Sequence, residues 1–299
     1  MGQKKRVIAL GFFDGVHLGH GALLRRVTEQ AAREGCVPAA VTYDHHPKNV
    51  IPGAEHVDLI NTPEDRAGLM RRLYGIEEVI ILPFDAHMRD MYWRDFVTEL
   101  LVKEYGAVHL VAGHDNHFGR KGEGDSARLR ALCGELGVGC DIIGEVMLDG
   151  IVISSTHIRA LIQAGDMEGA ARFLGHPHVL TGPVVHGKQL GRTIGIPTSN
   201  LVVPEGVLMP AFGVYATKVW AGERAYMAVT NVGVRPTVDD HSHRVTVEPW
   251  ILDFDGDLYG KEIRVEFYKQ LRRERKFGSV EELRAAILKN ADETREYFK

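Results

Sequence analysis

Two histidines stand three positions apart, directly after a glycine-rich turn near the start of the chain. Residues 11–20 are Gly-Phe-Phe-Asp-Gly-Val-His-Leu-Gly-His, so the pair is His17 and His20. Glycine lets a backbone approach phosphate closely, and the free N–H groups at a helix start attract anions. Two imidazoles there could neutralise the charge that develops on a leaving pyrophosphate. No Gly-Lys-Ser/Thr follows, which excludes a Walker A loop, but the chemistry favours a nucleoside triphosphate.

A second cluster of phosphate-binding type lies far downstream, at residues 153–159. Three adjacent hydroxyl side chains, Ser154, Ser155 and Thr156, are followed one helical turn later by Arg159. Taken alone, such hydroxyls most often only cap a helix N-terminus. An arginine one turn away adds a charged donor for phosphate oxygens. The two clusters together, with alternating strands and helices between them, are a much stronger indication of phosphate chemistry than either cluster alone.

Regularly spaced glycines interrupt a strand-like run in the second half of the chain. Gly187, Gly191 and Gly195 would free backbone N–H groups to cradle a polyphosphate. Lys188 and Arg192 lie between them and add positive charge. This stretch predicts a second nucleotide site.

Neutral oxygen ligands follow this second site. Thr198 and Asn200 are alternate residues, so in an extended chain both side chains point the same way. Mg²⁺ that bridges ATP phosphates takes a few such oxygens and keeps water for its other positions. Phosphoryl transfer to a hydroxyl also needs a carboxylate as general base, and Glu248, Asp253 and Asp255 are the candidates.

Alternating strands and helices must position the first of these sites. Short β-branched runs alternate with amphipathic segments up to about residue 143, which predicts a doubly wound parallel sheet covered on both faces. Such sheets bind ligands beyond the carboxyl ends of their strands. We predict strands at residues 6–10, 37–42, 78–82, 109–112 and 139–143, and helices at 20–34, 62–75, 94–105 and 125–136.

The pattern changes near residue 180 to consecutive strands without helices between them. This predicts an antiparallel β-barrel, with strands at residues 179–186, 214–220, 225–232, 244–252 and 263–270. Ser279 and Glu282 form a capping box that begins a terminal helix. We therefore expect an α/β domain at residues 1–178 and a barrel domain at 179–299.

Composition limits the partners and the compartment. The 299 residues are 44% hydrophobic and 25% charged, with a net charge of −4, which gives no support for a nucleic-acid or anionic-membrane surface. No apolar run is long enough to span a membrane. The three cysteines, Cys36, Cys133 and Cys140, argue against a disulfide framework and for a reducing, cytoplasmic location.

Residues 11–20 and 153–159 resemble the nucleotidyltransferase domain of the bacterial bifunctional riboflavin kinase/FAD synthetase family. The resemblance implies that the phosphate of FMN attacks the α-phosphate of ATP and that pyrophosphate leaves. It gives His17 and His20 the catalytic role. The residues that it implies for nucleotide and phosphate binding are Gly11, Phe13, Asp14, Gly15, Ser155, Thr156 and Arg159.

The second half is similar to the riboflavin kinase domain of the same family. The shared pattern is Gly-x-Val-x-His-Gly-x-x-x-Gly-Arg-x-x-Gly-x-Pro-Thr-x-Asn, which ends at Asn200, followed by segments around Asn231 and Glu248. By resemblance, Glu248 activates the ribityl 5′-hydroxyl, and Thr198 and Asn200 hold magnesium and phosphate. A stretch that resembles the family's flavin lid runs from Arg272 to Phe277, and we expect flavin contacts from Asn231, Arg272 and Phe277.

Two segments of the first half depart from the family pattern. After Tyr43, His45 stands where a proline is expected, and in residues 113–119 Asn116 replaces an aromatic residue. By resemblance these segments line the nucleotide or flavin pocket, so we expect Asp115 to bind nucleotide and Tyr43, Asn116 and Phe118 to bind flavin. Burying unpaired polar groups costs about 1–3 kcal/mol each, so the pocket could be adapted to another ligand.

The leading hypothesis is an enzyme that makes FMN from riboflavin and ATP, and then FAD from FMN and ATP. Mg²⁺ is the expected cofactor and ATP the co-substrate, with no tightly bound group, and neither nucleic acid nor membrane is expected as a partner. One alternative is a paralogue whose transferase uses another nucleotide, such as CTP, or a flavin analogue. Another is that one domain only binds flavin, although the retained His17, His20 and Glu248 argue against it.

Overall fold

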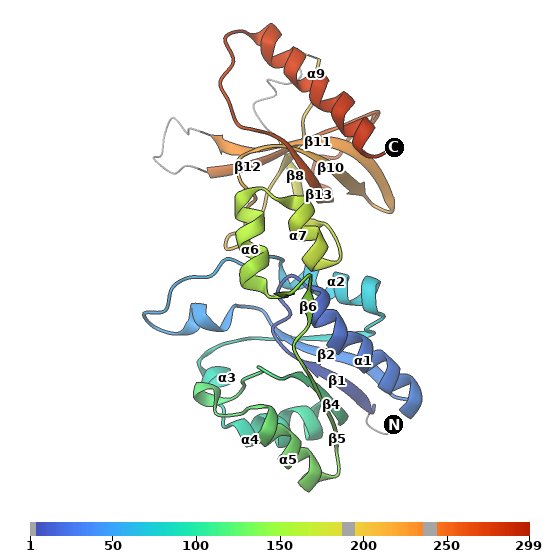
Figure 1. Ribbon diagram of the computed structural model, residues 1–299, viewed down its shortest axis with the longest axis vertical. Helices are drawn as coiled ribbons and strands as arrows, with labels where there is room; N and C mark the ends of the chain where they lie inside the picture. Colours follow the sequence, from blue (N-terminus) through green and yellow to red (C-terminus); the bar gives the residue numbers. More distant parts are fainter. Residues whose placement is uncertain (1–3, 187–194, 236–243) are drawn as a thin grey trace. The chain divides into compact units, whose positions relative to one another are not determined.

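The chain folds into two compact units, each with its own core. The structure, a computed structural model, describes residues 4–186, 195–235 and 244–299. Unit 1 comprises Met1–Ser155 and unit 2 comprises Thr156–Lys299. Figure 1 labels many of the elements of both units.

Unit 1 is built on a five-stranded sheet with the order β3-β2-β1-β4-β5, and all of its strands are parallel. The strand order reverses between β1 and β4, and the crevice at such a point, beyond the carboxyl ends of the strands, is where open α/β sheets bind ligands. The predicted doubly wound fold of the first half is therefore confirmed. The strands are β1 (Arg6–Leu10), β2 (Val37–Tyr43), β3 (Glu78–Leu82), β4 (Ala107–Gly113) and β5 (Gly139–Ile143).

The two helices nearest the predicted phosphate site begin and end as their local sequences require. Helix α1 (Leu18–Glu34) ends at Gly35, whose φ of 63° is left-handed. Helix α2 (Pro63–Tyr74) begins with Thr62, whose hydroxyl accepts from the backbone of Asp65. The other elements of unit 1 are η1 (Pro47–Val50), α3 (Ala86–Asp90), α4 (Trp93–Asp95), η2 (Phe96–Glu104), η3 (Arg120–Gly122), α5 (Ser126–Leu136) and the hairpin strands β6 (Met147–Leu148) and β7 (Ile151–Val152).

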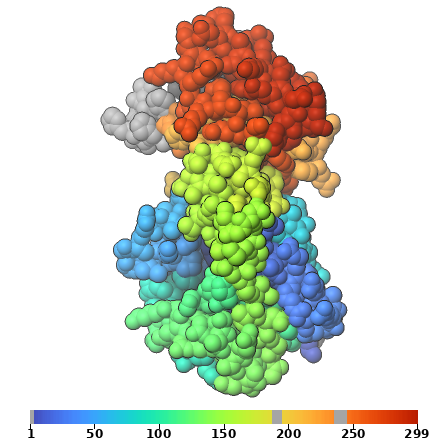
Figure 2. Space-filling view, viewed as in Figure 1, coloured from blue at the N-terminus to red at the C-terminus, as the bar shows by residue number. Residues whose placement is uncertain are grey.

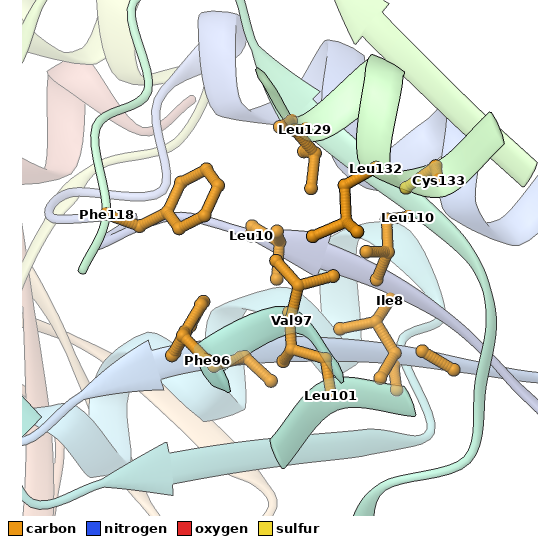
Figure 3. Packing of buried hydrophobic residues seen from close by; sticks show 14 of the residues in the cluster. Ile8, Leu10, Phe96, Val97, Leu101, Leu110, Phe118, Leu129, Leu132 and Cys133 are labelled. Atoms are coloured by element: carbon orange, nitrogen blue, oxygen red, sulfur yellow. The ribbon is translucent and has the colours of Figure 1, made fainter. Parts of the chain in front are cut away.

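Alternate residues of β1 serve opposite faces of the sheet. Ile8 and Leu10 pack against η2 and α5 in the cluster of Figure 3. Val7 and Ala9 pack against α1 and α2 on the other face. A central parallel strand buried on both sides has this pattern, and it leaves only the strand ends available for chemistry.

Unit 2 is a closed barrel with the strand order β10-β11-β12-β9-β8-β13 and an added C-terminal helix, as predicted for the second half. Short helices α6 (Ser155–Ala164) and α7 (Met167–Leu174) precede the barrel. No helix among the described residues is long and apolar enough to cross a membrane. The remaining elements are β8 (His178–Val185), β9 (Asn200–Leu201), β10 (Gly213–Ala221), β11 (Arg224–Arg235), β12 (Arg244–Ile251), β13 (Glu262–Arg273) and α9 (Val280–Tyr297).

The cap of α9 confirms the predicted capping box with one variation. The backbone N–H of Glu282 donates to the Ser279 hydroxyl at 3.2 Å, while the Glu282 carboxylate accepts from Gly278, one residue earlier than expected. Ala291 of α9 packs with Val214 and Val229 of the barrel. Helix α9 forms part of the outer surface of unit 2, in red in Figure 2.

Candidate active sites

The turn between β1 and α1 has an unusual backbone. Phe13, Gly15 and Val16 have φ values of 57°, 82° and 43°, all in the left-handed region. This conformation costs little for glycine but is strained for a β-branched valine. The backbone N–H of Val16 donates to the Phe13 carbonyl at 2.9 Å, which helps to hold the turn. Strain of this kind gathers at ligand sites, where the surrounding structure over-determines the backbone.

The two histidines of the motif lie face to face at the start of α1. Their ring centroids are 3.5 Å apart and nearly parallel. His17 caps the helix, because its Nδ1 accepts from the backbone N–H of His20 at 3.2 Å. A neutral His17 therefore carries its proton on Nε2. Burial, then His17 and then Arg66, lower the pKa of His20 well below its usual value, so His20 is neutral near pH 7.

Asp14 and Ser155 tie distant segments to this turn. The Asp14 carboxylate is buried and accepts from the backbone N–H of Ile60 at 3.0 Å. The Ser155 hydroxyl donates to the Asp14 carbonyl at 2.9 Å across 141 positions of sequence. Asp14 thus shapes the turn, while Ser155 brings the start of α6 to it. Thr156 and Arg159 follow on α6, in unit 2.

Arg66, on α2, is a residue of this region that the sequence analysis missed. It is fully buried, and its Nη1 donates to the Phe12 carbonyl, the Thr42 hydroxyl and the Tyr43 carbonyl at 2.9, 2.7 and 2.9 Å. It therefore joins the carboxyl ends of two neighbouring strands directly beneath the turn. An arginine early in an amphipathic helix gives no sequence signal for this position.

The structure shows the surroundings of His45 and Asn116, the two residues that depart from the family pattern. The His45 side chain is 69% exposed and lies 2.9 Å from the Asp44 carboxylate. Asn116 is half-buried, and its side-chain amide is not among the buried polar atoms without a partner in the described part of the chain. The expected cost of burying these polar groups therefore does not arise, and nothing at either position requires a different ligand.

The remaining sequence-predicted residues of unit 1 differ in their surroundings. Tyr43 packs edge-on against Phe84 with ring centroids 4.9 Å apart, and burial raises its pKa. Asp115 is exposed in the loop after β4. Phe118 is buried in the hydrophobic core against Phe96, with ring centroids 5.6 Å apart. Tyr43 and Asp115 thus lie at the carboxyl edge of the sheet, whereas Phe118 contributes to the core.

In unit 2, Glu248 lies at the centre of a row of polar residues that crosses three strands. It pairs with Asn231 on β11. On its other side Leu201 pairs with Val247, so the antiparallel register sets Asn200 beside Glu248. Cross-strand neighbours share one face of a sheet, so the three side chains form one row.

Glu248 and Asn231 of this row line a cavity of about 370 Å³ inside unit 2. Of the three carboxylates considered from sequence, Glu248 lines this cavity, whereas Asp253 is exposed and pairs with Arg295 at 3.1 Å. Seven of the thirteen lining residues are apolar and six are polar or charged, a mixture that suits a flat aromatic ligand that carries a polar chain. The lining residues are Ile196, Thr198, Val214, Val229, Asn231, Glu248, Trp250, Arg272, Glu274, Arg275, Phe277, Leu283 and Ile287.

A second cavity, of about 220 Å³, adjoins the first through Thr198, which lines both. Tyr259 lines the second cavity and stacks on His186 with ring centroids 3.6 Å apart. Gly195 has a φ of 73°, a conformation that favours glycine. The other predicted phosphate-binding residues of this segment, Gly187, Lys188, Gly191 and Arg192, lie outside the described residues.

Phe277 lies between two guanidinium groups at the rim of the larger cavity. Arg272 and Arg275 approach its ring centroid to 5.2 and 4.8 Å. Burial and the neighbouring Arg275 lower the pKa of Arg272. Its Nε donates to the Asn290 side chain of α9 at 3.0 Å. The end of β13 is thereby connected to the terminal helix.

Thr198 and Asn200 offer a hydroxyl and an amide oxygen to a hard cation. Both donors are neutral, so a magnesium ion there would need the charge of a polyphosphate. The described residues contain no group of three His, Cys, Asp or Glu side chains arranged to hold a metal. A hydroxyl and an amide oxygen fit a magnesium ion that is bound together with a nucleotide.

Comparisons with known proteins match the two halves of the chain to two different domain families. A family model described as FAD synthetase matches residues 1–157, and one described as riboflavin kinase matches residues 174–298. A bifunctional riboflavin kinase/FMN adenylyltransferase of Listeria monocytogenes is 36% identical over 98% of this chain and 92% of its own length. The protein of that name from Bacillus subtilis is 34% identical over 99% of this chain and 93% of its own length.

A solved structure resembles the chain over nearly its full length. It is a crystal structure described as a macrolide-efflux protein from Streptococcus pneumoniae, with a TM-score of 0.85 and 30% sequence identity. The match covers 99% of this chain and 95% of that one. The combination of an α/β unit and a barrel unit is therefore shared with an experimental structure.

Proposed function

The chain belongs to the bifunctional riboflavin kinase/FMN adenylyltransferase family, and from this premise we propose that it converts riboflavin to FMN and FMN to FAD, with ATP in both reactions. We assign nucleotidyl transfer to residues 1–178 and kinase activity to residues 179–299. The three cysteines are free thiols, which supports a reducing, cytoplasmic location.

Glu248 carries the kinase half of the proposal, because it lines the larger cavity between Asn231 and Asn200. Riboflavin occupies this cavity and ATP the smaller one, so Thr198 stands between the two substrates. The Glu248 carboxylate accepts the proton of the attacking hydroxyl. That oxygen bonds to the γ-phosphorus as the bond to ADP breaks, and the products are FMN and ADP.

The oxygen donors of Thr198 and Asn200 would hold Mg²⁺ together with the phosphates of ATP. When bound, the ion would neutralise charge on the phosphates that are transferred or left behind. Arg272, Arg275 and Phe277 would close the rim of the cavity and exclude water from the reacting groups.

In unit 1, the turn at residues 11–20 binds the triphosphate of a second ATP. A phosphate oxygen of FMN attacks the α-phosphorus, and the bond to the β,γ-pyrophosphate breaks. Neutral His17 and His20 donate hydrogen bonds to the phosphates while negative charge moves onto the leaving group. Asp14 and Ser155 hold the turn in shape.

Product analysis tests both halves at once. The protein is incubated with riboflavin, Mg²⁺ and each nucleoside triphosphate in turn, and the flavins are separated by chromatography. We expect FMN and FAD with ATP and no other flavin dinucleotide. FMN alone would refute the transferase assignment, no product would refute the kinase assignment, and a dinucleotide made from CTP would refute the choice of ATP.

A further inference from the structure

We propose that Arg66 is a positioning residue for nucleotidyl transfer in unit 1. It fixes the β1–α1 turn through its contacts with the ends of β1 and β2, and it keeps a positive charge beside that turn. The inference rests on the proposed function of unit 1. Arg66 is fully buried and has no direct place in the chemistry described above. Its contacts, its unpaired donors and its electrostatic neighbours support this role independently.

The contacts of Arg66 converge on the ends of two strands. A single nitrogen, Nη1, serves one carbonyl that follows β1 and two acceptors at the end of β2, all within 2.9 Å. Thr42 completes the link, because its hydroxyl donates to the Phe12 carbonyl at 2.7 Å. Phe12 also places its ring 4.3 Å from the guanidinium carbon. The residue that precedes the strained turn is therefore held on both its carbonyl and its ring.

The remaining donors of Arg66 are unusual for a buried arginine. Its Nε and Nη2 are shielded from solvent and have no hydrogen-bond partner among the described residues. The Nδ1 of His20 is in the same condition. Buried polar atoms are nearly always paired, so orphaned atoms in a native fold need an explanation. We infer that the protein tolerates this cost because the charge acts on an anionic ligand at the turn.

Electrostatics connects Arg66 with both the acids around it and the histidines above it. Burial lowers the pKa of Arg66 to about 10, against the opposing effect of Asp14, Glu64 and Asp44, so it remains a cation near neutral pH. It is also one of the groups that lower the pKa of His20, after burial and His17. A fixed charge next to a neutral imidazole favours a negatively charged transition state without reorganisation.

Substitution of Arg66 tests the proposal in the intact chain, with the kinase reaction as an internal control. In Arg66→Met, kcat for FAD formation from FMN and ATP should fall on the order of 10²-fold, the effect of a small misplacement of catalytic groups. Riboflavin phosphorylation should stay within about twofold, because its residues belong to unit 2. Arg71→Met is the matched control, since Arg71 is exposed near the end of the same helix.

The pH profile separates a positioning role from a merely structural one. Loss of the cation should move the ionisation of His20 in kcat/KM to higher pH in Arg66→Met. In Arg66→Lys the charge stays, so that ionisation should not move, while kcat falls because an ammonium lacks the planar fork that reaches three acceptors. If Arg66→Met does not fold, Arg66→Lys still tests the proposal. Its kcat for FAD formation should be reduced, while the pH dependence of its kcat/KM should match that of the wild type.

Two results would overturn the inference. One is FAD formation at the wild-type rate in Arg66→Met or Arg66→Lys. The other is a loss of rate in Arg66→Met with the His20 ionisation unmoved. Failure of the proposed function looks different, because then the wild-type protein itself would not convert FMN and ATP to FAD.

Discussion

Glu248 is the residue whose removal should separate the two reactions most cleanly. In Glu248→Gln the shape of the side chain and its place between Asn200 and Asn231 are kept, but the proton acceptor is lost. We expect riboflavin phosphorylation to fall by about 10²–10⁴-fold, while supplied FMN is still adenylylated. The matched control is Asp253→Asn, an exposed carboxylate paired with Arg295, which should keep both activities. Phosphorylation near the wild-type rate in Glu248→Gln would assign the base elsewhere.

His20 should have the reverse effect. His20→Ala removes the ring that stacks on His17 and the donor proposed for the triphosphate. We expect FAD formation to fall by about 10²-fold or more while FMN formation continues. His45→Ala in the same unit removes an imidazole that is 69% exposed and should leave both rates unchanged. Equal effects of the two substitutions on FAD formation, measured by steady-state kinetics, would contradict the assignment.

Much of the residue chemistry could be predicted because it follows from side-chain type and spacing. The pair His17 and His20 and the general base Glu248 belong to short motifs. Arg66 could not be predicted, because its role depends on contacts with Phe12 and Thr42, which lie 54 and 24 positions away. The supporting role of the Asp14 carboxylate could not be predicted for the same reason. Its partners are the backbone N–H groups of Ile60 and Asn61, just before α2 and more than 40 positions away in the sequence.

At the scale of elements, strand β8 contains a buried histidine that should make barrel stability depend on pH. Burial, then His176, lower the pKa of His178 from 6.5 to about 3. The folded state therefore takes up its proton at lower pH than the unfolded state. This contribution to stability is complete above pH 6.5 and is lost as the pH falls toward 3.

Denaturant titrations of unit 2 between pH 7 and pH 4 would measure this dependence, with Trp220 and Trp250 as fluorescent probes. His178→Leu should flatten the loss of stability on acidification, because an apolar side chain at this site has no proton to bind. Exposed His87 gives the control His87→Leu, for which we expect the wild-type slope. An unchanged slope in His178→Leu would show that another group governs acid unfolding of the barrel.

The elements that the sequence predicted well have a regular spacing of apolar residues, and their helices also have capping residues at both ends. Helix α2 has its threonine cap and a glycine at its end, and β3 lies at the predicted residues. Two-residue strands such as β9 carry no period, so they were missed. The helix expected at residues 94–105 divides into α4 and the π-helix η2, because apolar spacing alone does not distinguish a wider turn from an α-helical one.

At the scale of the whole molecule, the order of the motifs along the chain predicted two folds and two chemistries. A βα alternation can be recognised because each parallel strand needs a crossover, and a run of strands without helices implies antiparallel pairing. The cavities could not be predicted in this way. Thr198 lines two adjoining cavities because the barrel closes and brings the segment before β9 alongside β12. The backbone N–H of Ser199 in that segment donates to the Pro249 carbonyl of β12 at 2.9 Å.

If residues 1–178 and residues 179–299 each hold a complete set of reacting groups, two differently damaged chains should restore the full pathway when mixed. Glu248→Gln makes little FMN, and His20→Ala makes FMN but little FAD, so neither alone converts riboflavin to FAD at an appreciable rate. In a mixture, FMN released by one chain is a substrate for the other. We expect FAD to appear after a lag, and the lag should shorten as the concentration of the His20→Ala protein is increased. Chromatography of samples taken over time measures this lag. If each variant keeps its own reaction but the mixture yields no FAD, then FMN does not pass between chains, and the two units act only within one molecule.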